Sequence, residues 1–168
     1  GHIRRTDDLG RIIIPKEIRQ FLNIRENEPL EISVMERGIY IEKYQPLQTL
    51  ESLCEQYLTV LFKSCNIACA VCSNEQIIRS KGISLSTGQL LSAPLRKGIQ
   101  NLETDHYSEE SPLRVFDDSK YLLDSVYPVG SKEQPLGAVI LLHYRSTTPE
   151  ERCCAKLIAD ILTELTIN

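Results

Sequence analysis

Apolar residues in the first 46 positions follow several short patterns. A β-branched run at residues 12–14 predicts a short strand, and Pro15 suits the first position of a helix at residues 16–22. Apolar and polar residues alternate at 30–34 and again at 39–41, which predicts a hairpin turning at Arg37-Gly38. About 45 residues bury too little surface to fold alone without a metal or a disulfide. We therefore expect residues 1–46 to form an obligate oligomer.

Residues 46–64 form a connector that begins at Pro46 and carries one continuous apolar stripe at helical spacing. The stripe consists of Leu50, Leu53, Cys54, Tyr57, Leu58, Leu61 and Phe62. It predicts a linker helix over residues 47–64 that packs against a second domain, a partner chain, or both.

The remaining residues, 65–168, carry the patterns of an α+β domain. We expect strands at residues 67–72, 76–80, 121–129 and 135–144, a helix at 88–99, and a polar, acidic loop at 101–112. Thr148 is placed to cap a final helix that has Pro149 at its first position. The apolar stripe of that helix is Cys154, Leu157, Ile158, Ile161, Leu162 and Leu165. The two long stripes carry more apolar surface than is needed to cover one face of a sheet. We therefore expect the helices of this domain to associate with another chain and give a tetramer.

Composition and charge narrow the class of protein. Hydrophobic residues make up 42% and charged residues 25% of the chain, as in ordinary globular proteins. No apolar run approaches the roughly 20 residues that span a bilayer, so we expect a cytoplasmic protein with no membrane partner. The net charge of −4 argues weakly against nucleic-acid binding, but it is distributed unevenly. Residues 1–46 hold eight basic and eight acidic residues, whereas residues 47–168 hold 11 and 15, which accounts for all of the −4.

Basic side chains gather at the beginning of the chain, where residues 1–20 hold five Lys or Arg and three Asp or Glu. The basic residues are Arg4, Arg5, Arg11, Lys16 and Arg19. Asp8 and Gly10 suit a tight turn between two strands, and the last two basic residues share a helical face. Such a set can contact phosphates and guanine edges, and a dimer would double it. On charge alone, solvated surface residues balanced by Asp7, Asp8 and Glu17 are the commoner explanation.

The segment from Arg4 to Arg19 resembles the AbrB-type swapped-hairpin DNA-binding domain. The resemblance covers residues 1–44 and rests on Asp8-Leu9-Gly10-Arg11, Ile14-Pro15, Glu17-Ile18-Arg19, Leu30-Glu31-Ile32 and Lys43-Tyr44. It implies that two chains exchange hairpins into one barrel-like dimer, which binds double-stranded DNA and regulates transcription. By position, Arg4, Arg11 and Arg19 match the family's DNA-contacting arginines. Gln20 stands where some members carry a further arginine, and this departure can alter sequence preference.

The whole chain resembles those AbrB-type regulators that act in sporulation and carry a helix and a GAF domain after the DNA-binding domain. Beyond the order of elements, this resemblance rests on Pro128-Val129 and on Pro135-Leu136-Gly137-Ala138-Val139. It implies a tetramer that activates and represses genes at the nucleoid of the forespore. It also implies a GAF-like domain that senses a small molecule or only assembles the tetramer.

The six cysteines are expected to be free thiols, because the sequence has no secretory signal. Cys65, Cys69 and Cys72 have the spacing of a cluster-binding motif. Cys69 and Cys72, however, fall in a predicted strand and point to opposite faces, which favours structural thiols. Cys153, beside Arg152 near the start of the last helix, keeps a thiol enzyme of the GAF type open as an alternative.

No catalytic or metal-binding constellation stands out. His2, His106 and His143 are scattered, and none has a carboxylate and a nucleophile at a spacing that suggests catalysis. We therefore expect a protein that is not an enzyme and holds no cofactor or metal. An AbrB-type antitoxin is a further alternative, although an antitoxin would carry a polar tail in place of a second folded domain.

Overall fold

The computed structural model describes residues 1–107 and 109–167. It divides the chain into two compact units, Gly1–Tyr44 and Gln45–Asn168. Ser108, in the expected acidic loop, and Asn168, at the end of the expected second domain, lie outside the described residues.

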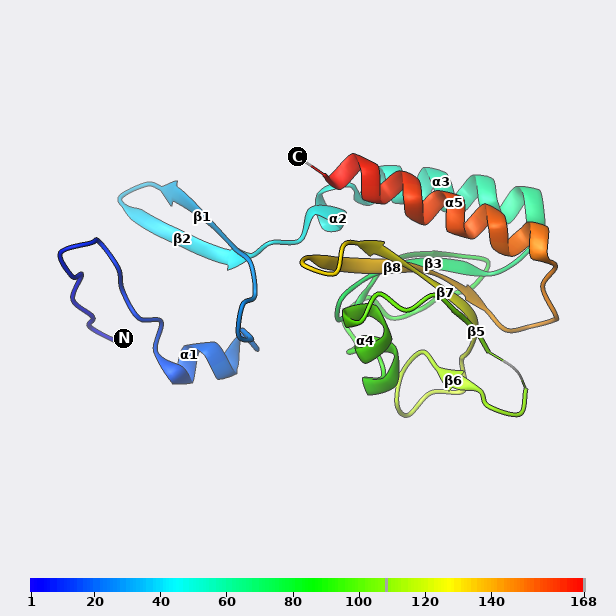
Figure 1. Cartoon of the computed structure of the whole chain (residues 1–168), viewed down its shortest axis with the longest axis horizontal. Helices are drawn as coiled ribbons and strands as arrows, with labels where there is room; N and C mark the ends of the chain where they lie inside the picture. Colours follow the sequence, from blue (N-terminus) through cyan, green and yellow to red (C-terminus); the bar gives the residue numbers. More distant parts are fainter. Residues whose placement is uncertain (108, 168) are drawn as a thin grey trace. The chain divides into compact units, whose positions relative to one another are not determined.

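The first unit contains one short helix and one β-hairpin (Figure 1). Helix α1 spans Lys16–Phe21, and strands β1 (Leu30–Met35) and β2 (Gly38–Lys43) pair antiparallel. The alternating pattern therefore predicted the hairpin correctly. Because Ile32 pairs with Ile41 and Val34 with Ile39, the alternation gathers apolar side chains on one face of the hairpin.

That apolar face is largely uncovered within the unit. Ile32, Val34 and Ile39 are 68%, 83% and 69% exposed, and Pro15 is the one buried residue among residues 1–44, all of which are described. A soluble domain rarely leaves so much of its apolar surface in water.

The expected strand at residues 12–14 is wrong, because these residues form no regular element. A strand requires a neighbour that receives its backbone hydrogen bonds. Across the preceding turn, the Asp7 N–H donates to the Arg11 carbonyl at 3.1 Å, and the pairing of the two chain segments ends there. Helix α1 then begins at Lys16, with Pro15 as its N-cap residue.

The second unit has three layers, with one antiparallel sheet between helices (Figure 1). Its helices are α2 (Pro46–Thr49), α3 (Glu51–Cys65), α4 (Ala93–Gln100) and α5 (Pro149–Thr166). Its strands are β3 (Cys69–Ser73), β4 (Ile77–Lys81), β5 (Asp105–His106), β6 (Leu113–Arg114), β7 (Leu122–Gly130) and β8 (Pro135–Leu142). The sheet order is β4-β3-β8-β7-β5, and β6 also pairs with β7. Helices α3 and α5 lie side by side on one face and α4 lies on the other, so the expected α+β class is confirmed.

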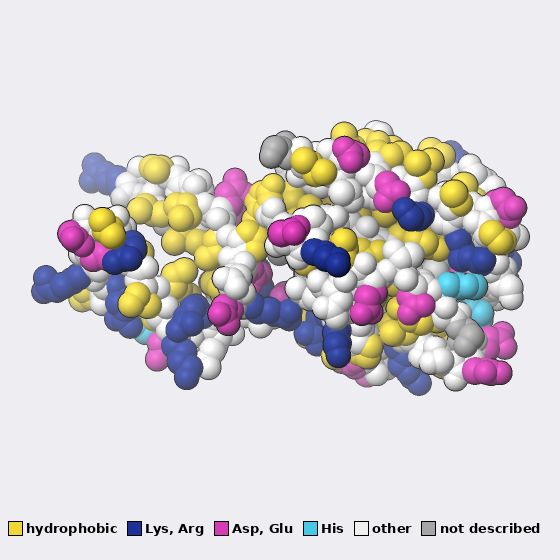
Figure 2. Space-filling model, in the orientation of Figure 1, with side chains coloured by type: hydrophobic (Ala, Val, Ile, Leu, Met, Phe, Trp, Pro, Cys, Tyr) yellow, Lys and Arg dark blue, Asp and Glu magenta, His cyan; other side chains and the backbone are white. Residues whose placement is uncertain are grey.

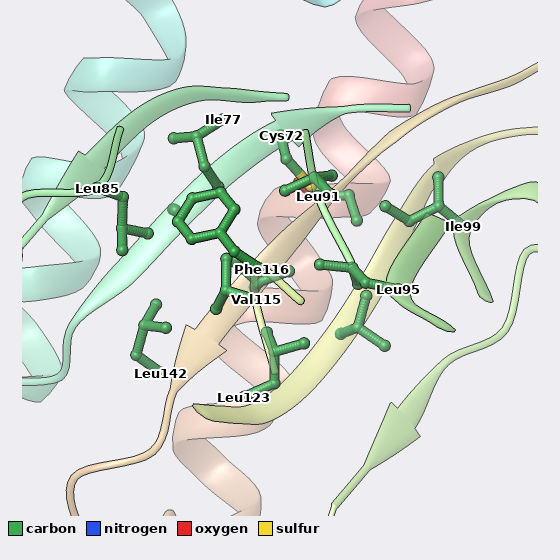
Figure 3. Packing of buried hydrophobic residues seen from close by; sticks show 14 of the residues in the cluster. Cys72, Ile77, Leu85, Leu91, Leu95, Ile99, Val115, Phe116, Leu123 and Leu142 are labelled. Carbon is green, nitrogen blue, oxygen red and sulfur yellow. The ribbon is translucent and has the colours of Figure 1, made fainter. Parts of the chain in front are cut away.

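A large apolar cluster fills the α4 side of the sheet (Figure 3). Phe116, Leu91, Leu95, Ile99 and Leu123 are among its buried members. On the opposite face, the core is formed where α3 and α5 pack on the strands. Burial of both sheet faces explains why the strands carry continuous apolar runs rather than alternating ones.

One glycine allows the two central strands to approach closely. Gly137 in β8 has a φ of 152°, and a Cβ at this position would overlap the carbonyl oxygen of Cys72 in β3. A larger residue there would meet both backbone strain and a clash with backbone.

The helix expected at residues 88–99 begins later, at Ala93. Leu90 bridges to Gln76, and the Leu91 N–H donates to the Glu75 carbonyl at 2.8 Å, so this stretch is tied to the β3–β4 turn. Ser92 then caps α4 by accepting a hydrogen bond from the Leu95 N–H. The helix begins where the side-chain cap becomes available.

The apolar stripe expected on α5 packs on the sheet only in part. The buried residues of α5 are Ala155, Ala159, Leu162 and Thr166, so Leu162 is the only member of the predicted stripe that is fully buried. Leu157 and Leu165 are 60% and 48% exposed. Small alanine side chains allow the helix to lie close to the sheet, and this turns the larger apolar residues outward.

Candidate nucleic-acid interface

The first functional segment is built around a turn that Asp7 holds in place. Asp7 Oδ1 accepts hydrogen bonds from the backbone N–H groups of Leu9 (2.9 Å) and Arg11 (2.8 Å). The Gly10 N–H donates to the Asp7 carbonyl at 3.1 Å, and Gly10 has a φ of 77°, which favours glycine. The turn was expected to depend on Asp8 and Gly10, and Asp7 was missed. Asp at the first position and Gly at the fourth position of a turn is the signal that would have identified Asp7.

The same carboxylate fixes the Arg11 side chain. Arg11 Nε lies 2.7 Å from Asp7 Oδ2, yet the Arg11 side chain remains 72% exposed. The backbone N–H and the guanidinium of Arg11 hold the pKa of Asp7 below its usual value. A pair through Nε leaves the terminal amino groups of the guanidinium available to bind a phosphate or a guanine edge.

The other four predicted contact residues are also exposed. Lys16 and Arg19 lie on α1, and Arg19 Nε donates to the Ile14 carbonyl at 3.1 Å. Arg4 and Arg5 precede the turn, and an Arg4 amino group donates to the Ile3 carbonyl at 3.0 Å. Figure 2 shows basic side chains projecting from the first unit among apolar ones. All five are therefore accessible, but only the Arg11–Asp7 pair is fixed by an ion pair within this described segment.

The structure also brings together polar residues in the second unit that are far apart in the sequence. His106 Nε2 lies 3.6 Å from an oxygen of Asp124, a carboxylate that is 1% exposed. His106 borders a pocket near the start of α5, which is also lined by Arg152 and Cys153. The residues come from β5, β7 and α5, so their spacing along the chain gave no signal.

The cysteines are free thiols, as expected. Cys69 and Cys72 point to opposite faces of β3: Cys69 Sγ lies 3.7 Å from the Leu58 carbonyl oxygen, and Cys72 Sγ lies 3.5 Å from that of Ala138. Burial raises the pKa of each of these two thiols to about 12 and that of Cys54 to about 11. Such thiols are poor nucleophiles and poor metal ligands at neutral pH.

Within residues 1–107 and 109–167, no three or more His, Cys, Asp or Glu side chains are grouped so that they could hold a metal ion. No helix in the same described part of the chain has the length and apolar character needed to cross a membrane.

Comparison with known proteins places these features in a family. Residues 3–49 match the family model described as antidote-toxin recognition MazE, bacterial antitoxin. The chain is 31% identical over 157 residues to Stage V sporulation protein T of Bacillus subtilis (strain 168), covering 89% of this chain and 87% of that protein. This chain belongs to the stage V sporulation protein T family of AbrB-type regulators.

Other members of the AbrB family match the first unit. The Transition state regulatory protein AbrB of the same organism is 43% identical over 51 residues, which cover 30% of this chain and 53% of that protein. The Putative transition state regulator Abh is 39% identical over 46 residues, or 27% of this chain and 50% of that protein. The N-terminal unit is thus an AbrB-like domain, and the chain is a member of a family of DNA-binding regulators of transcription.

Proposed function

We propose that the chain is a sequence-specific transcription regulator that contacts double-stranded DNA through Arg4, Arg5, Arg11, Lys16 and Arg19. The observation that carries the proposal is the exposed, preorganised Arg11 in an AbrB-like unit. Its ion pair with Asp7 reduces the side-chain entropy cost of binding a phosphate. The other four basic residues extend the positive surface along the same segment.

The DNA-binding form is a dimer through residues 1–46. The exposed apolar face of the β1–β2 hairpin supports this proposal, because a second copy of the unit would bury it. Residues 12–14 would then gain, from a partner chain, the strand neighbour that the single unit does not supply. The swapped-hairpin dimer of the AbrB type satisfies both requirements.

The second unit assembles two such dimers into a tetramer and serves as a GAF-like sensor rather than an enzyme. Val60 on α3 is 61% exposed, and Leu157 and Leu165 on α5 are 60% and 48% exposed, so the neighbouring helices present apolar side chains to solvent. The raised pKa values of Cys54, Cys69 and Cys72 count against these buried thiols as nucleophiles. Cys153, the thiol on which the enzyme alternative rests, is exposed at the pocket beside α5. Similarity to Stage V sporulation protein T supports a role in sporulation. The proposed place of action is the nucleoid in the cytoplasm of the forespore.

An antitoxin is the second candidate function, because the matched family model is described as a bacterial antitoxin. That match ends at residue 49, whereas the similarity to Stage V sporulation protein T continues through the folded second unit. The longer similarity favours the transcription regulator.

DNA binding by an Arg11→Ala variant of the full chain tests the proposal. If Arg11 binds one phosphate per chain, the salt dependence of log K should fall by about 0.9 for each phosphate that is no longer neutralised, and affinity should fall. Arg37→Ala, which removes an exposed arginine from the β1–β2 turn, is the matched control and should bind as the wild type does. An Arg11→Ala variant with normal affinity and salt slope would exclude this role for Arg11.

A further inference from the structure

An open, shallow pocket of about 420 Å³ lies beside the first turns of α5. Its polar lining includes Thr104, His106, Tyr127, Arg152, Cys153 and Lys156. These side chains come from the β5 segment, from β7 and from α5. The pocket is separate from the apolar cluster on the α4 side of the sheet, which is filled by its own side chains (Figure 3).

A single buried carboxylate organises this pocket from behind. Asp124 Oδ2 accepts hydrogen bonds from the hydroxyls of Ser125 (2.8 Å) and Thr147 (2.9 Å), while Asp124 Oδ1 lies 3.6 Å from His106 Nε2. An amino group of Arg152 in turn donates to the Thr147 hydroxyl at 2.8 Å and to the Thr147 carbonyl at 2.7 Å. Asp124 therefore positions Arg152 through Thr147, and its second oxygen faces the His106 imidazole across 3.6 Å.

The groups that reach the pocket are mainly hydrogen-bond donors. Arg152 and Lys156 are cations, although Lys156 also pairs with Asp160 at 2.8 Å. Tyr127 adds a hydroxyl, and burial is the main cause that raises its pKa above the usual value. Asp105, the carboxylate in the lining, already accepts the His106 backbone N–H at 2.8 Å. Asp105 and Asp124 offset the cations, so the directional hydrogen-bond donors rather than the net charge suit an anion with several acceptor oxygens.

Assembly through the outward face of α5 would leave the pocket open. At about 100° per residue, Arg152, Cys153 and Lys156 share one side of the helix. Leu157, Ile161 and Leu165 follow a second side, and the buried alanines follow a third. The pocket and the proposed tetramer contact are thus on different faces of one helix.

We infer that this pocket binds a small molecule through an oxyanion group, either a carboxylate or a phosphate, which Arg152 and His106 hold. This inference rests on the proposed sensor role of the second unit, and it gives that role a site and a ligand class. Arg152 offers the directional donors that planar or tetrahedral oxyanions accept. The size of the pocket suits a metabolite rather than a macromolecule.

Isothermal titration calorimetry of the full chain with two probes, citrate and inorganic phosphate, tests the inference. We expect at least one probe to bind at one site per chain, and the probe that binds identifies the kind of oxyanion. Arg152→Gln and His106→Gln should each weaken that binding by about tenfold or more, because each removes a charged or polar donor. Lys97→Gln, an exposed change on α4, and Arg11→Ala, in the first unit, should leave binding unchanged.

Two further measurements make the result decisive. In Asp124→Asn, the imidazole ¹⁵N signals of His106 should shift and probe affinity should fall. His106→Gln should keep the wild-type melting temperature, so that its loss of binding is not explained by loss of the fold. Absence of binding by both probes, or equal affinity in the wild type and Arg152→Gln, would overturn the inference. DNA binding by the same wild-type sample is measured in parallel: if DNA binds and the probes do not, only the inference fails, and if the probes bind but DNA does not, the proposed function fails.

Discussion

At the scale of single residues, carboxylates accept backbone hydrogen bonds at a turn in the first unit and at the start of a helix in the second. Asp7 holds the turn that presents Arg11, and Glu151 completes a capping box with Thr148 at the start of α5. Both terminal amino groups of Arg145 donate to Glu151, at 3.0 and 2.7 Å, and Arg145 also donates to the Cys65 carbonyl. Glu151 therefore stabilises the start of α5, and through Arg145 it connects that end to the end of α3.

This arrangement predicts a pH-dependent contribution to stability. The Arg145 guanidinium is the main cause that lowers the pKa of Glu151 to about 2. Since the folded-state pKa is below the unfolded one, the contribution is present above pH 4.5 and is lost as the pH falls towards 2. Glu151→Gln should lower the free energy of unfolding by about 1–2 kcal/mol at pH 7, because the half-exposed Arg145 is partly screened by solvent.

Urea unfolding at several pH values measures this effect. The difference between wild type and Glu151→Gln should shrink below pH 4.5, whereas Glu150→Gln, an exposed neighbour, should show little difference at any pH. A difference that is constant with pH would mean that ionised Glu151 does not stabilise the helix start.

At the scale of elements, the sequence predicted those helices and strands whose position depends on neighbouring residues along the chain. Alternation predicted the β1–β2 hairpin, and the Thr148-Pro149 pair predicted the start of α5. The face of α5 that packs on the sheet was not predictable from large apolar residues alone, because Ala155 and Ala159 occupy it. The β-branched run at residues 12–14 forms no strand, because the unit contains no neighbour that could pair with it. The His106–Asp124–Arg152 grouping depends on β5, β7 and α5 coming together, which no spacing along the chain records.

The outward faces of α3 and α5 lead to a prediction about assembly. Val60→Asp combined with Leu157→Asp places charges on exposed apolar positions, so the second unit should keep its fold. If these faces are buried between chains, desolvation of the new charges should dissociate the tetramer into dimers. Light scattering measures the mass, and circular dichroism verifies the fold.

Leu162→Ala is the contrasting variant, because Leu162 is fully buried in the unit itself. It should cost about 2–5 kcal/mol of stability and lower the melting temperature. An unchanged mass for the double Asp variant would show that the helices do not form the tetramer contact.

At the scale of the whole molecule, two different apolar surfaces lie in two separate units. One is the face of the hairpin in residues 1–44, and the other is formed by α3 and α5. In the proposed assembly, a contact through the first surface would give a dimer, and a different contact through the second would join dimers in pairs. Two unlike two-fold contacts are the usual basis of a closed tetramer.

The first contact predicts how a fragment of residues 1–46 behaves. Its small buried core makes a folded monomer unstable, so unfolding should accompany dissociation. On dilution, the loss of circular dichroism and the fall in mass by analytical ultracentrifugation should follow the same concentration dependence. A folded monomer at low concentration would contradict the dimer proposed for this unit.

The three faces of α5 have a consequence for how the sequence can change. An inserted or deleted residue within the helix rotates everything after it by about 100°, so it exchanges one face for another. An insertion between Lys156 and Leu157 would leave Arg152 and Cys153 at the pocket but turn Ala159 and Leu162 off the sheet. Length variation in this family is therefore expected to spare α5 and to accumulate in loops, and homologues aligned across this helix should contain substitutions but no gaps.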